Sequence, residues 1–212
     1  MTSNDDDNSS AKRAKTSNIV CISGPQWVDI AYFEIHYAGP ITEEWNNGAE
    51  FVVGAAERID QFAQQHLAEL VSKSGSAEEA RRVTVHDKAA KPGKDYVDGR
   101  LYSKFNLVNT YVDYTARDLA MARMANKLIC VPPQFAGHTS GCMLVKLAFE
   151  LRDDELALRI HKMLRSGESD AAYKQLLPKV KPIYQQMYEE SVAQKLAAKK
   201  MAEAMGMQFV DV

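Results

Sequence analysis

The stretch Ile19-Val20-Cys21-Ile22-Ser23-Gly24-Pro25 decides the fold, because a continuous apolar run ends there in a cluster of turn residues. A strand that is apolar on both faces is typical of a parallel sheet covered by helices on both sides. Three further runs follow the same pattern: Phe51-Val52-Val53 before Gly54, Val83-Thr84-Val85 before His86, and Leu128-Ile129-Cys130-Val131 before Pro132-Pro133. The sequence therefore predicts four short buried strands, each broken by turn residues.

Helical segments separate these strands. Apolar residues recur at three- and four-residue spacing between Ile59 and Val71, which predicts an amphipathic helix after the second strand. Residues 119–124 and 143–148 predict helices on either side of the fourth strand. The stretch 30–45 must hold the crossover between the first two strands, and we expect Gly39-Pro40 to interrupt it. This alternation predicts an α/β fold with a Rossmann-like, doubly wound, mainly parallel sheet and right-handed crossovers.

The chain divides into three parts by composition. Residues 1–18 are polar and predict a disordered tail. Residues 19–150 form the Rossmann-like domain, in which residues 87–113 lack a clear period and predict a long loop or lid over the strand ends. Residues 151–212 predict a helical C-terminal extension, which either packs against the sheet or forms a homodimer.

The bulk composition is that of an ordinary globular protein, with 25% charged and 46% hydrophobic residues and a net charge of -2, which disfavours general nucleic-acid binding. No apolar run approaches the roughly 20 residues of a membrane span, and the N-terminus lacks the apolar segment of a secretory signal. Three cysteines without a CxxC favour a reducing compartment. We therefore expect a cytoplasmic protein without a metal site or a cofactor. Lys12, Arg13 and Lys15 are either a nuclear address or incidental charges of a solvated tail.

In an open parallel sheet, ligands collect beyond the carboxyl ends of the strands. Three of the four loops at these ends lead toward helix starts, where unpaired N–H groups favour an anion such as phosphate. In the fourth loop, Thr139 or Ser140 can cap the next helix while backbone amides face outward; the alternative is that these residues only cap the helix and turn the chain. The ligand-binding candidates in the loops are Ser23, Gly24, Gln26, Trp27, Gly54, Ala55, Arg58, His86, Pro132, Thr139, Ser140 and Gly141.

Several charged residues near these loops are candidates for chemistry. His86 and Asp87 end the third strand, where a base and an orienting carboxylate could act on a glycosidic bond, or could simply cap the strand. Arg117 and the adjacent Asp118 could hold a phosphate and a ribose hydroxyl, or form a surface ion pair. Glu34 lies in an aromatic-rich segment that either stacks a base or belongs to the core.

Three segments resemble the SLOG superfamily of Rossmann-like nucleotide-binding domains, which includes the Smf DNA-processing proteins and the Lonely Guy cytokinin-activating hydrolases. They are VCISGP at 20–25, FVVGAAERID at 51–60 and MARMANKLICVPPQFAGHTSG at 121–141. The resemblance spans residues 19–150 and implies that Ser23, Gly24, Gly54, Ser140 and Gly141 line a nucleotide or nucleotide-sugar pocket. Asp60 matches the acidic residue that the family places early in its second helix.

Two positions depart from the family pattern. Arg58 stands where the family usually has glycine, and its guanidinium could bind a phosphate. Val145 falls where the Lonely Guy enzymes carry their catalytic glutamate, so that their particular activity is not expected.

Three functions follow as hypotheses. The first is a protein that binds a nucleotide, nucleoside phosphate or nucleotide-sugar and hydrolyses its N-glycosidic bond, with Asp60, Asp87 or Glu34 as acid/base and Arg58 or Arg117 on the phosphate. The second is an enzyme like the nucleoside deoxyribosyltransferases. The third is a non-catalytic nucleotide sensor that signals through its C-terminal helices. Whether the chain is an enzyme is left open by the sequence.

Overall fold

The chain folds around a parallel five-strand sheet with the strand order β4-β3-β2-β1-β5. The computed structural model describes residues 18–26, 28–91, 95, 97–130 and 141–166. All four neighbouring strand pairs run parallel, which confirms the predicted Rossmann-like α/β class. The strands are β1 (Ile19–Ile22), β2 (Glu50–Gly54), β3 (Val83–Lys88), β4 (Asn106–Tyr111) and β5 (Lys127–Ile129).

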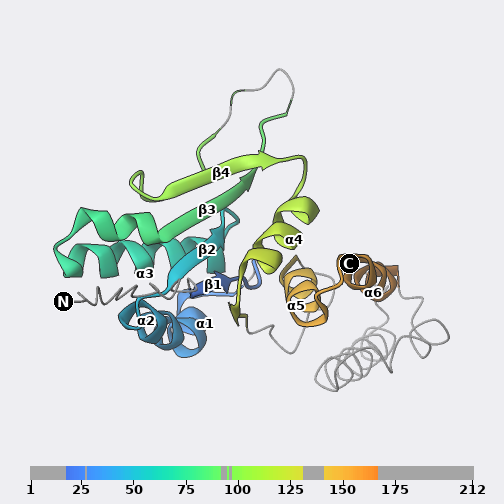
Figure 1. The fold of residues 1–212 in the computed structure, drawn as a ribbon, viewed down its shortest axis with the longest axis horizontal. Helices are drawn as coiled ribbons and strands as arrows, with labels where there is room; N and C mark the ends of the chain where they lie inside the picture. The colour runs from blue at the N-terminus through green and yellow to red at the C-terminus, as the bar shows by residue number, and fades with distance from the viewer. Residues whose placement is uncertain (1–17, 27, 92–94, 96, 131–140, 167–212) are drawn as a thin grey trace, which may run out of the picture.

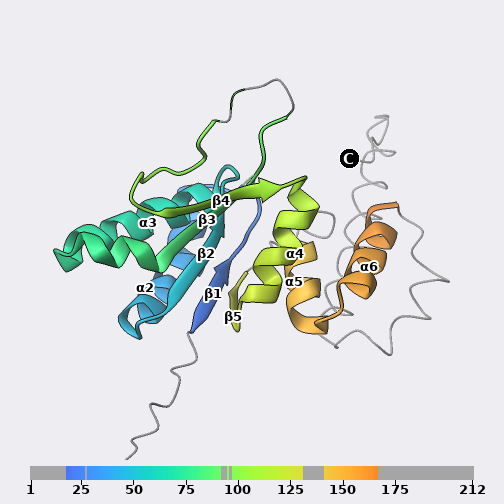
Figure 2. The same cartoon turned by 45° about the horizontal axis from the view of Figure 1, so that its top comes forward.

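Helices cover the sheet on both sides, with α1, α2 and α3 on one face and α4 and α5 on the other (Figures 1 and 2). Helix α6 packs against α5 and extends the second layer outward. Among the residues that the structure describes, no helix is long and apolar enough to cross a bilayer. The helical segments are α1 (Ile30–Phe33), the π-helical turn η1 (Glu34–Ala38), α2 (Gly39–Asn46), α3 (Ile59–Ser74), the 3-10 segment η2 (Ala77–Arg82), α4 (Tyr114–Met124), α5 (Gly141–Leu151) and α6 (Asp154–Ser166).

Strand β1 lies at the centre of two hydrophobic cores, which explains its continuous apolar run. Val20 and Ile22 point into the core beneath α1–α3, whereas Cys21 points into the core beneath α4–α6. All three side chains are fully buried. The predicted strand that is apolar on both faces is therefore confirmed, because each face of β1 meets a different helical layer.

The crossover between β1 and β2 remains helical through Gly39-Pro40, which we had expected to interrupt it. Pro40 is the second residue of α2, and because it has no N–H, one carbonyl of the preceding turn lacks the usual helical hydrogen bond. The π-helical turn η1 directly precedes it. Its wider turn leaves room for the proline ring, which would otherwise clash with a carbonyl of the preceding turn.

The sequence predicts a loop over residues 87–113, but the structure places the edge strand β4 within this interval. Prediction missed β4 since two asparagines, Asn106 and Asn109, weaken its strand pattern, and because an edge strand has no continuous apolar run. Its residues are only partly buried. The long connection between β3 and β4 is thereby reduced to residues 89–105.

A buried glutamine ties this long connection to the sheet. The side-chain amide of Gln64, on α3, donates to the carbonyl of Gly54 at 3.0 Å and to that of Gly99 at 3.4 Å. Its side-chain oxygen accepts from the backbone N–H of Leu101 at 2.8 Å. Gln64 is fully buried. It therefore joins the end of β2, the helix α3 and the returning chain before β4.

Loss of this glutamine side chain is expected to destabilise the protein. Gln64→Ala leaves the buried Gly54 carbonyl without its partner and opens a small cavity, so that the free energy of unfolding should fall by about 2–4 kcal/mol. Urea denaturation of the variant and the original protein measures this fall in the free energy of unfolding. Gln65→Ala, at an exposed position of the same helix, is the control and should change the value by less than about 0.5 kcal/mol. Equal effects of the two substitutions would contradict the role of Gln64 as a clamp.

Candidate functional site

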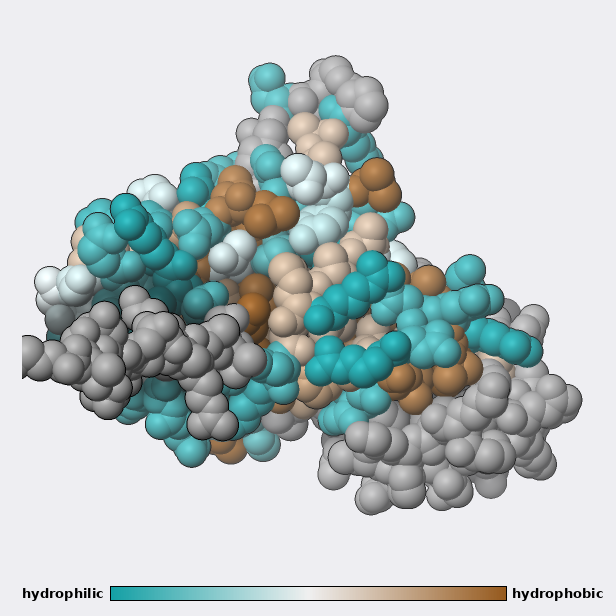
Figure 3. All heavy atoms as spheres, viewed as in Figure 1, coloured by the Kyte–Doolittle hydropathy of each residue, from teal (hydrophilic) through white to brown (hydrophobic). Residues whose placement is uncertain are grey.

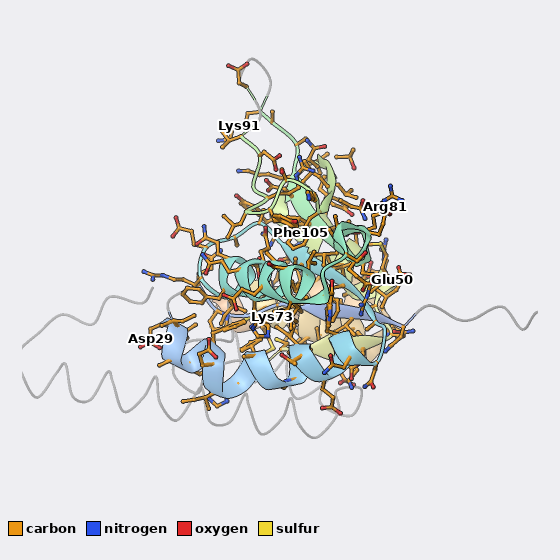
Figure 4. The ribbon with its side chains drawn as sticks, turned by 90° about the vertical axis from the view of Figure 1, so that its left-hand side faces the viewer. Asp29, Glu50, Lys73, Arg81, Lys91 and Phe105 are labelled. Atoms are coloured by element: carbon orange, nitrogen blue, oxygen red, sulfur yellow. The ribbon has the colours of Figure 1, made fainter. Side chains whose placement is uncertain are left out.

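The loops after β1, β2 and β3 emerge at one edge of the sheet, because the strands are parallel. Ile22 pairs with Val53, and Gly54 pairs with His86, so that neighbouring strands end at the same level. Figure 4 places Glu50, the first residue of β2, and Arg81, which precedes β3, at one side of the molecule, Asp29, which follows β1, at the other, and Lys91, which follows β3, on the protruding chain at the top. The strand order changes direction at β1, because β2 lies on one side of it and β5 on the other, and open α/β sheets commonly bind ligands at such a position.

A buried guanidinium occupies the space below the ends of β2 and β3. Arg117, on α4, donates from Nε and Nη2 to Oδ1 of Asp118 at 2.9 and 2.7 Å. Asp60, at the start of α3, accepts from the backbone N–H of Ala56 at 3.2 Å and interacts electrostatically with Arg117. The three side chains are each less than a tenth exposed. Sequence analysis allowed a surface ion pair for Arg117 and Asp118, and the structure instead buries both.

Three glycines make room for the carboxylates of this region. A Cβ atom on Gly54 would lie 2.1 Å from Oδ2 of Asp60 and 3.3 Å from Nη1 of Arg117. One on Gly141 would lie 2.6 Å from Oδ2 of Asp118. One on Gly99 would lie 2.9 Å from Oδ2 of Asp87 and 2.5 Å from Cβ of Ala55. Each carboxylate therefore needs the absence of a side chain on a particular loop, and the three loops come from different parts of the chain.

Burial shifts the protonation of this cluster. Desolvation raises the pKa of Asp60 to about 7, against the lowering effect of Arg117 and with a further increase from Asp118. Desolvation also raises the pKa of Asp118, although Arg117 opposes it. The pKa of His86 is lowered to about 4 by desolvation and then by the positive charge of Arg117. The edge thus holds a neutral histidine and a carboxyl group that titrates near neutral pH.

A pocket of about 380 Å³ lies beside this cluster, at the foot of the chain that protrudes after β3 (Figure 1). The ring of Tyr114, the first residue of α4, forms part of its wall. The ammonium group of Lys88 lies 4.5 Å and the guanidinium of Arg117 4.9 Å from the centre of this ring. The pocket combines carboxylates, ammonium groups and apolar side chains. Its lining residues are Ala55, Asp87, Lys88, Ala89, Ala90, Lys91, Asp95, Val97, Gly99 and Tyr114.

The structure brings part of the predicted set together. Gly54, Asp60, Arg117 and Gly141 meet in the buried cluster, and Ala55 and Asp87 line the pocket. His86 is buried next to them, with its Nδ1 at 2.8 Å from the hydroxyl of Tyr111. Two buried polar atoms of these residues, Nε2 of His86 and Nη1 of Arg117, have no hydrogen-bond partner in the part of the chain that the structure describes.

For the predicted residues that follow β1, the structure shows backbone and packing contacts. Ser23 is held by backbone hydrogen bonds, donating its N–H to Ile129 and accepting from the hydroxyl of Tyr37. Gly24 is required by packing, because a Cβ atom there would lie 2.6 Å from Tyr37 and from Ile59. Gln26 is exposed. Trp27, Pro132, Thr139 and Ser140 fall outside the described residues.

Two charged candidates are exposed. Glu34 lies on the π-helical turn η1, where its charge acts on His66 of α3, and no described contact joins it to the buried cluster. Arg58 precedes α3 with φ 68° and ψ -109°, a backbone conformation that favours glycine. Arg58 therefore occupies a conformation that glycine would adopt with less strain.

Sequence analysis did not identify Tyr114, Lys88, Gly99 and Gln64 as parts of the site. Gly99 and Lys88 lay within the interval predicted as a loop. A glycine in a long connection was the only feature that could have pointed to Gly99. Tyr114 could have been found from Asp113, which caps α4 by accepting from the N–H of Ala116 and so fixes the start of this helix.

The fold and this edge define a Rossmann-like parallel α/β domain with a buried acid cluster and an adjoining polar pocket. Comparison with protein-family models, curated proteins and solved structures finds no significant match to the chain. Within the described residues, no group of three or more His, Cys, Asp or Glu side chains is placed to hold a metal ion.

The raised pKa of Asp60 predicts a pH-dependent effect of its replacement. In the folded state Asp60 keeps its proton up to about pH 7, whereas in the unfolded chain it releases the proton near pH 3.8. The contribution of Asp60 to the free energy of unfolding is therefore lost as the pH rises from about 4 through 7. Asp60→Asn removes this pH-dependent loss of stability, because asparagine does not titrate. The unfolding free energy of the variant relative to the original protein should therefore improve by about 2–4 kcal/mol between pH 4.5 and pH 8, at about 1.4 kcal/mol per pKa unit.

Taking the difference between the two proteins is essential, because His86 acts in the opposite direction. Its lowered pKa contributes stability that is present above about pH 6.5 and is lost as pH falls toward 4. Urea denaturation at several pH values gives the difference, and Glu69→Gln, at an exposed position of α3, is the control. A difference that does not change with pH would show that Asp60 does not titrate in this range.

Proposed function

We propose that this chain binds a nucleotide, nucleoside phosphate or nucleotide-sugar at the ends of β2 and β3 and hydrolyses its N-glycosidic bond. The observation that carries the proposal is the pocket in which Asp87, Lys88 and Tyr114 lie together, next to the buried cluster of Asp60 and Arg117. Nucleotides require an aromatic or apolar surface for the base, a cation for the phosphate and an acceptor for the ribose hydroxyls. The pocket supplies each of these groups.

Each wall of the pocket suits one part of such a ligand. Tyr114 is about half exposed and Val97 is 82% exposed, so that both offer apolar surface to a base. Lys88 and Lys91 supply ammonium groups for a phosphate. Asp87 accepts from the N–H of Lys88 through Oδ1, and its Oδ2 faces Gly99 at the pocket wall. A volume of about 380 Å³ lies in the range of small-molecule sites, about 300–1,000 Å³.

Hydrolysis of the N-glycosidic bond adds water across the bond between C1′ and the base nitrogen. The C1′–N bond breaks, a C1′–O bond forms, and the proton of the water passes to the released base. Asp87 is placed to stabilise the positive charge on the sugar and to accept the proton of the attacking water. The proton that Asp87 accepts then passes to the released base, and Arg117, which interacts electrostatically with both Asp87 and Asp60, stabilises the charge of Asp87.

The resemblance to the SLOG superfamily supports the same proposal. The matching segments 20–25 and 51–60 end β1 and start α3, at the edge where the cluster lies. Position 58 retains a backbone conformation suited to glycine although it carries arginine. Strained residues of this kind cluster at functional sites, and a guanidinium beside a helix start suits a phosphate.

The proposal predicts ligand-dependent stability and turnover. Nucleoside monophosphates of the four common bases should raise the unfolding free energy, by about 2.7 kcal/mol at a hundredfold excess over Kd. Lys88→Ala should weaken binding about tenfold, and Lys73→Ala, at an exposed position of α3, should not change it.

Asp87→Asn should retain binding but abolish the release of free base measured by chromatography, whereas Glu43→Gln should release the base normally. A chain that binds none of these ligands contradicts the proposal.

Arg58 allows stability and binding to be separated. Arg58→Gly relieves the backbone strain and should raise the unfolding free energy by about 1 kcal/mol while it weakens phosphate-dependent binding. Arg58→Ala keeps the strain and removes the guanidinium, so it should weaken binding without the gain in stability. Titration calorimetry and urea denaturation of the two variants test this. Full affinity in both variants would remove Arg58 from the site.

A further inference from the structure

Two of the three cysteines of the chain lie in contact between the end of β5 and the start of α5. Cys130 directly follows β5, and Cys142 is the second residue of α5. The sulfur atom of Cys130 lies 3.6 Å from the carbonyl oxygen of Cys142, and a hydrogen bond also joins the two thiol groups. All three cysteines are present as thiols. Cys130 and Cys142 therefore form a dithiol, although 12 positions separate them in the sequence.

The dithiol lies where the strand order changes direction. The backbone N–H of Ser23, after β1, donates to the carbonyl of Ile129, the last residue of β5, at 3.1 Å. Figure 2 shows β5 beside β1, on the side of α5. Gly141, the residue before Cys142, packs against Asp118 of the buried cluster. A covalent bond at Cys142 therefore fixes the start of α5 next to that cluster.

The three thiols differ in exposure. The second helical layer has a polar outer side, and Figure 3 shows its hydrophilic residues, in teal, over α4 and α5. Cys142 lies on the inner side of this layer and is 3% exposed, and Cys21, on β1, is fully buried. Cys130 is half-buried. Cys130 is thus the thiol that a small oxidant reaches first, and Cys142 is the thiol in contact with it.

We propose that Cys130 and Cys142 form a reversible intramolecular disulfide, with a small disulfide such as oxidised glutathione as the oxidant. The sulfur of Cys130 attacks one sulfur of the oxidant, so that the S–S bond of the oxidant breaks, a mixed disulfide forms and one thiolate leaves. The sulfur of Cys142 then attacks the sulfur of Cys130, which forms the intramolecular bond and releases the second thiolate. The two cysteines lose two electrons and two protons, and the oxidant takes them up as two thiols.

The contact between the sulfur atoms favours the bond, whereas the pKa of Cys130 limits its rate of formation. Because the folded protein already holds the two thiols together, the second step is intramolecular and loses little entropy. The hydrogen bond to Cys142 and then burial raise the pKa of Cys130, and the charge of Lys146 opposes them. Cys130 is therefore mostly protonated at neutral pH and reacts slowly, so that a sustained excess of oxidant is needed. Such a disulfide reports the redox state of its surroundings and does not depend on nucleotide binding.

Alkylation of the full chain tests the proposal. The chain is incubated with excess oxidised glutathione, denatured, treated with N-ethylmaleimide and weighed by mass spectrometry. The reduced chain should take up three maleimide groups, one for each cysteine, and the oxidised chain only one, at Cys21. Peptide mapping should find Cys130 joined to Cys142, and dithiothreitol should restore the uptake of three groups. The oxidised form should melt at least about 4 °C higher, because the bond closes a loop of the chain.

Single variants separate the two steps of the reaction. Cys142→Ser should accumulate the mixed disulfide at Cys130, seen as the added mass of one glutathione. Cys130→Ser should remain unmodified, because Cys142 is buried. Cys21→Ala is the matched control and should form the disulfide as the original protein does.

Uptake of three maleimide groups after prolonged exposure to the oxidant overturns the proposal. So does a disulfide that involves Cys21 or joins two chains, because the contact between Cys130 and Cys142 is then not the one that reacts. Peptide mapping uses the original protein, so this result does not depend on the folding of any variant.

Discussion

The buried guanidinium of Arg117 is the interaction on which the C-terminal edge of the sheet depends. Two carboxyl groups, Asp60 and Asp118, are removed from water with it, and an unpaired charge in such a place would cost several kcal/mol. Arg117 offsets that cost by hydrogen bonds to Asp118 and by its charge beside Asp60. The cluster does not neutralise itself completely: with one cation and two carboxyl groups, one of them must remain protonated or the cluster becomes anionic. The raised pKa of Asp60 expresses this imbalance.

The same interaction explains why glycine is needed at positions that are far apart in the sequence. Helix α4 can bring Arg117 to the strand ends only if β2 ends in Gly54, and α5 can start against Asp118 only if it starts with Gly141. A methyl group at either position would push a carboxylate away from the guanidinium. The geometry of the site is therefore set by contacts between helices and loops that are far apart in sequence.

The fold could be predicted because its evidence is local. The run Ile19–Ile22 is apolar on both faces and the spacing from Ile59 to Val71 is helical, and these patterns need no knowledge of distant contacts. Strand β4 could not be predicted in this way, since an edge strand with Asn106 and Asn109 is held by its neighbour β3 rather than by its own pattern. The continuous helix through Pro40 also depends on an unusual feature, the π-helical turn before it.

The candidate site was predictable only in part for the same reason. Parallel strands must end at one edge, so Gly54 and His86 could be placed together from sequence. The clamp formed by Gln64 and the contact of Gly99 with Asp87 depend on the return path of the chain before β4, which no local pattern specifies. Arg117 and Asp118 were ambiguous because adjacent opposite charges occur mostly on surfaces, and only the packing of α4 shows that they are buried.

Several departures from ordinary protein architecture lie at this edge. Arg58 adopts a backbone conformation suited to glycine, Asp60 and Arg117 are buried charges, and Nε2 of His86 is a buried polar atom without a described partner. Departures also occur away from this edge: Glu44 is a buried carboxylate that pairs with Lys127 at the start of β5, and Arg152 has a positive φ of 53°. Chains that fold to one structure keep their local and global preferences consistent and depart from them mainly where a function requires it. The strained backbone at Arg58 and the buried cluster around Arg117 are therefore arguments, independent of any resemblance, in favour of the proposed site at the ends of β2 and β3.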